Sequence, residues 1–346
     1  MQSSREIVRR SLKFENPERI ARDLWVLPWA ERYFPNEVAT LRERYSSDFA
    51  APGSVYRSSP KVKGNPYVIG EYVDEWGCVF TNYQDGVIGE VKEPMVKDIA
   101  DWKIIEPPYD TLPDDKQKAY DTISRFYEKT DKFVLANCCP RPWERYQFLR
   151  GTENAMVDMM MPEEGGADLL KAIHDFYLKE MEFWVKADVD AVMFMDDWGS
   201  QNQLLIPPRI WRELFKPLYK EYCDLAHAEG KFVFMHSDGY IQEIFTDLVE
   251  VGVDAINSQL FTMDFEYLRD NVKGKITFWG EIDRQHVLPS KNPQVGRDAV
   301  RKVAEYLYDP KGGIIAQLEF GAGANPETVM AVYDEWEKVS REIGRR

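Results

Sequence analysis

Acidic side chains, one histidine and one glutamine lie at the ends of a series of short apolar runs in the second half of the sequence. The residues at these positions are Asp196, Asp197, His236, Asp238, Gln259, Glu281, Asp283 and Glu319. Imidazole nitrogen and carboxylate oxygen are ligands for Zn²⁺, and carboxylates also act as general acids and bases. A buried carboxylate without a partner is costly, or it takes up a proton. If these side chains meet, they predict a metal site or an acid–base site.

The apolar runs alternate with longer segments of helical periodicity, a pattern typical of βαβ units in a parallel sheet. The candidate strands are residues 20–27, 132–138, 189–195, 231–236, 253–259, 275–281 and 312–319. These strands and their helices favour a closed α/β barrel of the (β/α)₈ TIM type, which fits in 346 residues. Because such barrels place the active site at the carboxyl ends of the strands, we expect the polar residues to converge at one mouth.

The first third of the chain departs from this pattern. Residues 66–91 alternate in polarity and contain the turn signal Gln84–Asp85–Gly86. This predicts an antiparallel β-hairpin insertion at residues 64–92. Because nothing resembling a flexible linker or a low-complexity stretch interrupts the sequence, we expect a single domain over residues 1–346.

Composition excludes several functional classes. The chain has 44 Lys and Arg against 59 Asp and Glu, and a net charge of -15 repels nucleic acid and anionic lipid. The absence of a long uncharged apolar run argues against a membrane span, and the absence of an apolar leader argues against secretion. The four cysteines have no paired spacing and are expected to be reduced thiols. A cytoplasmic protein is the expectation.

His236 ends a buried run and is followed by Asp238, which suits either a metal ligand or a hydrogen bond to substrate. A structural histidine bonded to a backbone carbonyl is the alternative. Asp196 and Asp197 are adjacent on a strand, so one is expected to face the cavity while the other braces a neighbouring group. Glu281 and Glu319 would be satisfied by Zn²⁺ or, alternatively, by ion pairs to Arg284 or to loop arginines.

Thiols and aromatic rings near the strand ends are candidates for binding a flat substrate. These are Cys138, Trp143, Trp198 and Trp279, to which the amide of Gln259 is added. A tryptophan at the end of a barrel strand is also ordinary packing, and a cysteine next to another is often simply small and buried. Both interpretations remain open for each residue.

Several motifs taken together resemble the uroporphyrinogen decarboxylase superfamily. They are residues 195–201 (MDDWGSQ), 206–208 (IPP), 215–217 (FKP), 235–239 (MHSDG), 252–257 (GVDAIN), 278–283 (FWGEID) and the Gly312–Gly313 strand. The resemblance covers roughly residues 130–340. It implies a distorted (β/α)₈ barrel and one of two chemistries, which are cofactor-free decarboxylation of a porphyrinogen and zinc-dependent methyl transfer to or from a corrinoid.

Departures from the family patterns favour the second chemistry. The decarboxylases carry N-terminal arginines and a late His–Gly pair, whereas this chain has only Arg32 of the arginine motif, with Pro28 at the other position, and has Phe320–Gly321. Thiol-methylating members hold zinc by His-x-Cys and a later cysteine, whereas this chain has His236-x-Asp238 and Glu319. An oxygen-rich zinc is more Lewis-acidic and suits polarising an ether oxygen. This indicates similarity to aryl methyl ether O-demethylases.

The resemblance therefore implies a methyltransferase that moves a methyl group from a small methoxylated, aromatic substrate to the Co(I) of cobalamin on a partner corrinoid protein. We expect His236, Asp238 and Glu319 to hold Zn²⁺. The acid–base candidates are Asp196, Asp197, Glu281 and Asp283. Decarboxylation, methyl transfer from a methylcorrinoid to a thiol or to tetrahydrofolate, and a catalytically idle barrel that only binds a corrinoid protein stay open as alternatives. The identity of the methyl donor and the direction of transfer are left open, and a homodimer is compatible with the sequence.

Overall fold

Eight parallel strands form a closed barrel in the computed structural model, which describes residues 2–343. Six of them make one sheet in the order β1–β12–β11–β10–β9–β8. Their bounds are β1 Ala21–Arg22, β8 Ala191–Met195, β9 Phe232–Ser237, β10 Ala255–Ser258, β11 Thr277–Trp279 and β12 Ile314–Ala316. The predicted TIM-type barrel is confirmed.

Two short strands close the ring, β3 (Phe49–Ala50) and β7 (Phe133–Val134), which pair with each other in parallel. A parallel bridge from Leu135 to Ala191 joins β7 to β8. On the other side, the Asp48 amide donates to the Arg22 carbonyl beside β1 at 2.8 Å. Because these two joints are so short, the barrel is distorted, as the resemblance implied. The sequence missed β3, since two residues are too few to show a periodicity.

Two of the predicted strands divide in the structure. Residues 20–27 contain β1 and β2 (Trp25–Val26), and residues 312–319 lead through β12 into β13 (Glu319–Phe320). The second segments pair in parallel, with Glu319 opposite Trp25. The barrel wall therefore extends beyond the main sheet at this point, on the side toward the carboxyl ends of the strands.

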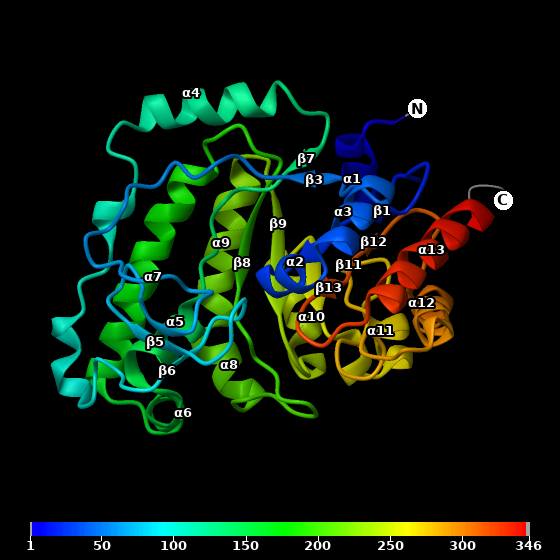
Figure 1. Cartoon of the computed structure of the whole chain (residues 1–346). Coiled ribbons are helices and arrows are strands. Elements are labelled where there is room, and N and C mark those ends of the chain that lie inside the picture. Colours follow the sequence, from blue (N-terminus) through cyan, green and yellow to red (C-terminus); the bar gives the residue numbers. More distant parts are fainter. Residues whose placement is uncertain (1, 344–346) are drawn as a thin grey trace.

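Helices cover the barrel on its outer face (Figure 1). Their bounds are α1 Ser4–Lys13, α2 Pro28–Tyr33, α3 Pro35–Arg44, α4 Lys116–Tyr127, α5 Pro142–Arg150, α6 Thr152–Met160, α7 Glu164–Trp184, α8 Pro208–Leu214, α9 Lys216–Ala228, α10 Gln242–Val251, α11 Phe265–Asn271, α12 Pro293–Leu307 and α13 Pro326–Ile343. Short 3₁₀ turns lie at Ile99–Ile104, Tyr109–Thr111 and Leu260–Thr262. In Figure 1, α7 and α9 lie on one side of β8 and β9, and α12 and α13 lie on the other.

The barrel interior is packed by side chains from alternating strand positions. Phe133, Phe234 and Trp279 belong to this inner cluster, and α1 contributes Ile7 and Val8 to it. Since α1 packs against β7 and β1, it closes the amino-terminal end of the barrel. The second cluster lies between the sheet and the outer helices. The amino-terminal end is therefore sealed by apolar packing, and the carboxyl end is left for polar side chains.

The expected antiparallel insertion is present as three strands rather than a hairpin. β4 (Gly70–Val73) pairs with β5 (Val79–Asn82), which pairs with β6 (Glu90–Val91). In Figure 1 this sheet lies beside α5 and α7, away from the amino terminus. None of the helices within residues 2–343 combines the length and the apolar character needed to cross a bilayer.

Candidate metal centre and adjoining cavity

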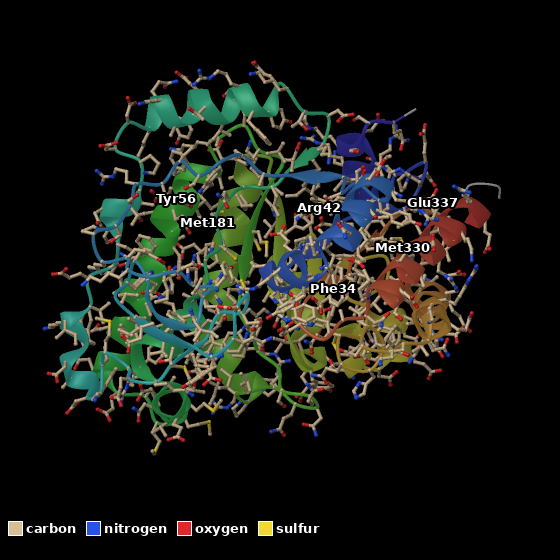
Figure 2. All side chains as sticks on the ribbon, in the orientation of Figure 1. Phe34, Arg42, Tyr56, Met181, Met330 and Glu337 are labelled. Atoms are coloured by element: carbon tan, nitrogen blue, oxygen red, sulfur yellow. The ribbon has the colours of Figure 1, made fainter. Side chains whose placement is uncertain are left out.

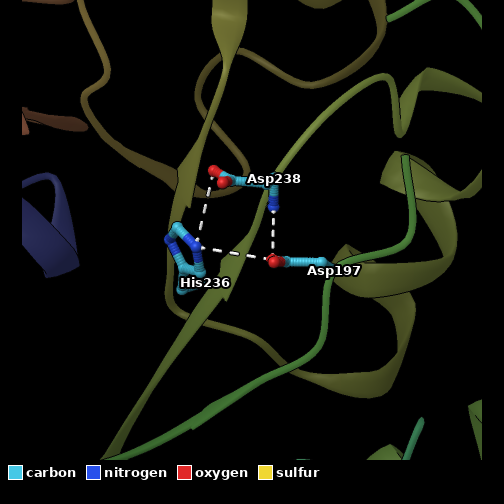
Figure 3. A group of neighbouring side chains, drawn as sticks. All are labelled: Asp197, His236 and Asp238. Atoms are coloured by element: carbon cyan, nitrogen blue, oxygen red, sulfur yellow. Dashed lines mark hydrogen bonds and ion pairs between the residues drawn. The ribbon is translucent and has the colours of Figure 1, made fainter. Parts of the chain in front are cut away.

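Asp197, His236 and Asp238 meet at the carboxyl ends of β8 and β9. One ligand atom from each residue lies within 4.8 Å of the others. His236 Nε2 is 3.5 Å from an oxygen of Asp197 and 3.5 Å from Oδ1 of Asp238 (Figure 3). The register explains the proximity, since Met195 is paired with His236 and the residues that follow on the two strands run side by side. The sequence analysis placed Asp238 with His236 as metal ligands and Asp197 among the acid–base candidates, and the structure brings all three side chains together.

Two glycines allow the loops after β8 and β9 to touch. A Cβ atom on Gly199 would lie 2.2 Å from the Tyr240 amide nitrogen, and one on Gly239 would lie 2.1 Å from the Gly199 carbonyl oxygen. Gly239 also has a φ of +77°, which favours glycine. This close approach lets the Asp238 amide donate to Asp197 at 2.9 Å. Backbone packing therefore fixes the two carboxylates beside the imidazole.

Asn257 of β10 sets the tautomer of His236. The Asn257 side-chain amide donates to the Trp279 carbonyl at 2.5 Å, so its Oδ1 is turned toward His236. That oxygen lies 2.6 Å from His236 Nδ1 and accepts its hydrogen. The lone pair of neutral His236 is therefore on Nε2, the atom that faces Asp197 and Asp238. Trp25 packs against the imidazole with ring centroids 5.5 Å apart.

The electrostatics of the three-residue group favour a cation. Burial alone would lower the pKa of His236, but Asp238, Asp197 and Glu281 raise the pKa above its ordinary value. Burial raises the pKa of Asp197, and Asp238 adds to this effect. Among the described residues, Asp238 Oδ1 is buried and accepts no hydrogen bond. An imidazole lone pair with two carboxylate oxygens fits a divalent ion such as Zn²⁺ and leaves a further coordination position open.

Arg284 forms ion pairs with three acids of the mouth. It donates to Asp238 Oδ2 at 2.5 Å and to Glu319 at 2.8 Å, and it lies 3.2 Å from Glu281. Burial raises the pKa of Glu281 to about 8, although Arg284 opposes the shift. The ion pair that the sequence left open as an alternative is therefore present for both glutamates. Glu319, which we expected to bind the metal, is held by Arg284 outside the three-residue group, because β13 lies on the β1–β2 side of the mouth.

Asp196 and Asp283, two of the expected acid–base residues, brace the backbone instead. Asp196 points out of the barrel and accepts from the Trp143 amide at 3.1 Å and from the Glu144 amide at 2.8 Å, which caps the start of α5. Its other donor is the Tyr219 hydroxyl at 2.6 Å. Asp283 accepts from the backbone amides of Gln285 and His286 in its own loop. The prediction that only one of the two adjacent acids, Asp196 and Asp197, faces the mouth agrees with this geometry.

The expected substrate-binding residues are dispersed. Trp143 and Trp198 are fully buried, stack on each other at 5.2 Å, and line neither of the cavities described below. Cys138 is buried with its thiol 3.8 Å from the Met193 carbonyl. Trp279 lies inside the barrel below His236, where its indole donates to Asp23. Gln259 accepts from the Gly239 amide and lines a small cavity of about 190 Å³. These positions correct the expectation for Trp143 and Trp198, because both face away from the mouth.

A larger cavity of about 690 Å³ lies between the insertion and helices α5 and α7. Its apolar wall includes Tyr72 and Phe80 of the insertion and Phe176 of α7. Its polar wall includes Arg141, Glu144 and Glu180. Figure 2 shows Tyr56, which also lines the cavity, beside the helix that carries Met181. No sequence pattern predicted this cavity, because its walls come from segments more than 100 residues apart.

Arg141 and Glu144 line the cavity and interact electrostatically with residues of the metal centre. Their charged groups lie 3.9 Å apart at the start of α5. Burial raises the pKa of Glu144 to about 7, Arg141 and His236 lower it, and Asp197 raises it further. Arg141 likewise lowers the pKa of Asp197. Both side chains are therefore close enough to feel the metal centre electrostatically, and both line the cavity.

Comparisons with known proteins agree with the barrel fold. A family model described as uroporphyrinogen decarboxylase matches residues 74–339. No curated protein matches the sequence. Among solved structures, a methyltransferase from Methanosarcina mazei superposes with a TM-score of 0.66 at 13% identity, and the match covers 98% of this chain and 99% of that chain. A putative vitamin-B12 independent methionine synthase from Listeria monocytogenes gives a TM-score of 0.46 at 11% identity, covering 88% and 84%.

Proposed function

The chain belongs to the uroporphyrinogen decarboxylase family, and from that premise we propose that it is a zinc-dependent methyltransferase that demethylates a methoxylated aromatic compound. The acceptor in this proposal is the Co(I) of a corrinoid carried by a partner protein. The observation that carries the proposal is the imidazole of His236, whose free Nε2 faces two carboxylates at the mouth of the barrel. The fold likeness to a methyltransferase supports the same choice.

Asp197, His236 and Asp238 would hold the metal. A bound Zn²⁺ would supply Lewis acidity for the ether oxygen, and the corrinoid would supply the nucleophile. In neutral His236, Asn257 holds the hydrogen on Nδ1 and leaves the lone pair on the ligand nitrogen Nε2, and Arg284 orients Asp238 by binding its second oxygen. These contacts fix the ligands before the metal arrives, which lowers the entropic cost of binding.

Arg141 and Glu144 are the residues of this chain best placed to act on the leaving oxygen. The guanidinium of Arg141 carries a permanent positive charge at the junction between the cavity and the metal centre. A positive charge there would stabilise a departing phenolate. Glu144, with a pKa raised to about 7, could hold a proton at near-neutral pH and release it to that oxygen.

The decarboxylase chemistry of the family receives less support from the cavity. Its walls carry Asp74, Glu75, Glu144 and Glu180 alongside arginines, and Arg145 is already paired with Asp74. A substrate with several carboxylates would meet these acids at short range. A neutral aromatic ether would meet the same acids without charge repulsion.

Elemental analysis together with a methyl-transfer assay tests the proposal. The purified protein is expected to contain about one zinc per chain and to form methylcobalamin from 2-methoxyphenol and free cob(I)alamin. His236→Ala should lose the metal and more than about 100-fold of the activity, because loss of a ligand should exceed the 10–100-fold typical of the outer shell. His286→Ala is a matched control, since that side chain is 79% exposed and outside the metal group. Absence of bound zinc after incubation with the metal, or full activity of His236→Ala, would refute the proposal.

A further inference from the structure

Asp23 is a buried aspartate directly after β1, and its carboxylate is surrounded by hydrogen-bond donors. The residue is 6% exposed. Its Oδ1 accepts from the Leu24 amide at 2.9 Å and from the Ser47 hydroxyl at 2.7 Å. Its Oδ2 accepts from the indole of Trp25 at 3.0 Å and from the indole of Trp279 at 3.1 Å. The carboxylate therefore accepts two hydrogen bonds at each oxygen, which is its full capacity.

The chemistry of the donors fits an ionised carboxylate. A backbone amide and an indole N–H can only donate. Ser47 Oγ accepts from the Phe49 amide at 3.0 Å, which leaves the hydroxyl hydrogen for Asp23. Burial raises the pKa of Asp23, while these hydrogen bonds lower it. A proton on either oxygen of Asp23 would displace one of the donors.

The two indoles that Asp23 binds both help to orient the imidazole of His236. The ring of Trp25 lies against His236 with centroids 5.5 Å apart. The carbonyl of Trp279 accepts from the Asn257 amide at 2.5 Å, and this bond turns Asn257 Oδ1 toward His236 Nδ1. The two indoles also meet edge to face at 5.0 Å. Two separate contacts of His236 therefore lead back to one carboxylate.

The backbone of Asp23 is held independently of its side chain. Its amide donates to the Ala316 carbonyl of β12 at 2.9 Å, and its carbonyl accepts from the Tyr333 hydroxyl of α13 at 2.5 Å. The carboxylate is therefore not needed to keep this segment in the barrel wall. Asp23 lines neither cavity of the site and is outside the metal group, so any effect it has on the metal centre acts through the indoles.

We infer that Asp23 is a positioning residue of the metal centre. Its carboxylate anchors the indoles of Trp25 and Trp279, and through them it fixes the ring of His236 with Nε2 directed at the two carboxylates of the centre. The inference rests on the proposed function for the presence of a metal, whereas the position of the ring can be measured without one. Outer-shell contacts of this kind orient a ligand before the metal binds.

Two substitutions of Asp23 separate the anchoring of the indoles from the negative charge. In Asp23→Asn, the amide oxygen can keep both indoles, and the amide nitrogen then meets the Ser47 hydroxyl, which can accept, and the Leu24 amide, which cannot. The opposite orientation would place the amide nitrogen against two indole N–H groups, so the first orientation is favoured. Asp23→Ala removes the acceptor of both indoles.

Competition with a chromophoric chelator measures the zinc affinity of the variants. Asp23→Ala should bind zinc about 10-fold more weakly than the wild type, at the lower end for outer-shell residues because Asp23 acts through the indoles. Asp23→Asn should stay within about 3-fold of the wild type, because it keeps an acceptor for both indoles. Wild-type affinity in Asp23→Ala, or equal losses in the two variants, would overturn the inference.

A second readout follows the imidazole in the zinc-free protein. The chain has four histidines, and His236→Ala identifies the signals of His236 in a spectrum of ¹⁵N-labelled histidine rings. At one fixed pH, Asp23→Asn should reproduce the wild-type chemical shifts of Nδ1 and Nε2, whereas Asp23→Ala should change both. Unaltered His236 shifts in Asp23→Ala would contradict the positioning role.

Asp158→Asn is the matched control for a general loss of stability. Asp158 is also 6% exposed, and it accepts from the Tyr146 hydroxyl at 2.9 Å and from Arg150 at 2.8 Å, outside the metal group. This variant should lose stability in thermal unfolding but keep the zinc affinity and the His236 shifts. A loss of zinc affinity equal to that of Asp23→Ala would attribute the effect to stability and overturn the inference.

Trp25→Phe keeps the test decisive if Asp23→Ala does not fold. It retains an aromatic ring beside His236 and removes only the indole N–H that Asp23 binds, together with part of the ring. Zinc binding should again be weaker than in the wild type, and an unchanged affinity would overturn the inference.

The inference and the proposed function can fail separately. If Asp23→Ala changes the His236 shifts but the wild type binds no zinc and transfers no methyl group, the positioning role stands and the proposed function falls. If the wild type binds zinc and transfers methyl groups but Asp23→Ala binds zinc equally well, only the role of Asp23 falls.

Discussion

Both ends of the barrel carry buried carboxylates, and the two ends treat them differently. At the amino-terminal end, Asp190 accepts from the Val134 amide at 2.7 Å and pairs with Arg5 and Arg9 of α1. Asp48 accepts from the Arg22 amide and pairs with Arg19. Every buried side-chain oxygen of these two aspartates has a hydrogen-bond partner.

At the carboxyl end, Asp196 accepts three hydrogen bonds, but several other buried carboxylate oxygens accept none. Both oxygens of Glu281, Oδ1 of Asp238 and Oε2 of Glu144 accept no hydrogen bond within residues 2–343, although Arg284 forms an ion pair with Glu281. Buried polar atoms are nearly always hydrogen-bonded, so a concentration of exceptions at one end needs an explanation. Fully hydrogen-bonded acids at the closed end therefore stabilise the fold, whereas the carboxylate oxygens without a hydrogen bond at the carboxyl end can accept a ligand.

The largest expected effect is a loss of stability, without a loss of zinc, at the closed end of the barrel. Asp190→Asn should lower the free energy of unfolding by about 3 kcal/mol, at the low end for breaking a buried ion pair because Arg9 is partly exposed. Urea unfolding measures this change, and zinc per folded chain should be unaltered. Asp188→Asn, two residues earlier and exposed, should change stability by less than about 0.5 kcal/mol. Unchanged stability of Asp190→Asn would show that the acids of the closed end do not stabilise the fold.

The same kind of substitution at Glu180, in the cavity beside α7, should change the stability in the opposite direction. The pKa of Glu180 is raised by burial from 4.5 to about 7 in the folded chain. Between these two pH values the folded state holds more protons than the unfolded state, so wild-type stability falls as pH rises. Glu180→Gln removes this loss.

The gain in the free energy of unfolding of Glu180→Gln over the wild type should be absent below pH 4.5, grow toward pH 7, and then level off at no more than about 3 kcal/mol. Thermal unfolding at a series of pH values measures the gain. A stability difference that does not depend on pH would show that this carboxylate is compensated in the folded chain.

A third variant tests whether the imidazole is prepared for a ligand. Asn257→Leu should weaken zinc binding by about 10–100-fold, because His236 loses the acceptor that fixes its tautomer. Competition with a chromophoric chelator measures the affinity. Ser258→Ala is the neighbouring control, since that hydroxyl is buried without a hydrogen-bond partner and should leave zinc affinity unchanged. Unaltered affinity in Asn257→Leu would place the control of the tautomer elsewhere.

The smallest expected effect concerns Glu319. Glu319→Gln should keep its zinc and lose less than about 1 kcal/mol of stability, because Arg284 retains Asp238 and Glu281 as partners. Elemental analysis and urea unfolding check both expectations. Loss of zinc from this variant would restore Glu319 to the ligand set that the sequence suggested.

Local sequence patterns predicted most strands of the barrel and the end of the barrel at which the polar residues lie. Apolar runs that alternate with helical segments follow from local backbone periodicity, so β8 to β12 and the antiparallel insertion could be predicted from short windows. The pairing of His236 with Asp238 is also local, since two residues along a strand share a face. That the domain is single remains a prediction.

Only the tertiary structure decided which partner each polar group meets. Glu319 could have met a metal or Arg284, and the choice depends on where β13 lies against β2. Asp196 and Asp197 are neighbours whose side chains point to opposite faces of the strand. Asp196 caps α5, whereas Asp197 faces His236. The cavity with Glu180 depends on contacts between α7 and the segment that carries Tyr56. Periodicity is a property of neighbouring residues, whereas hydrogen-bond partners and cavities are set by packing between residues far apart in the chain.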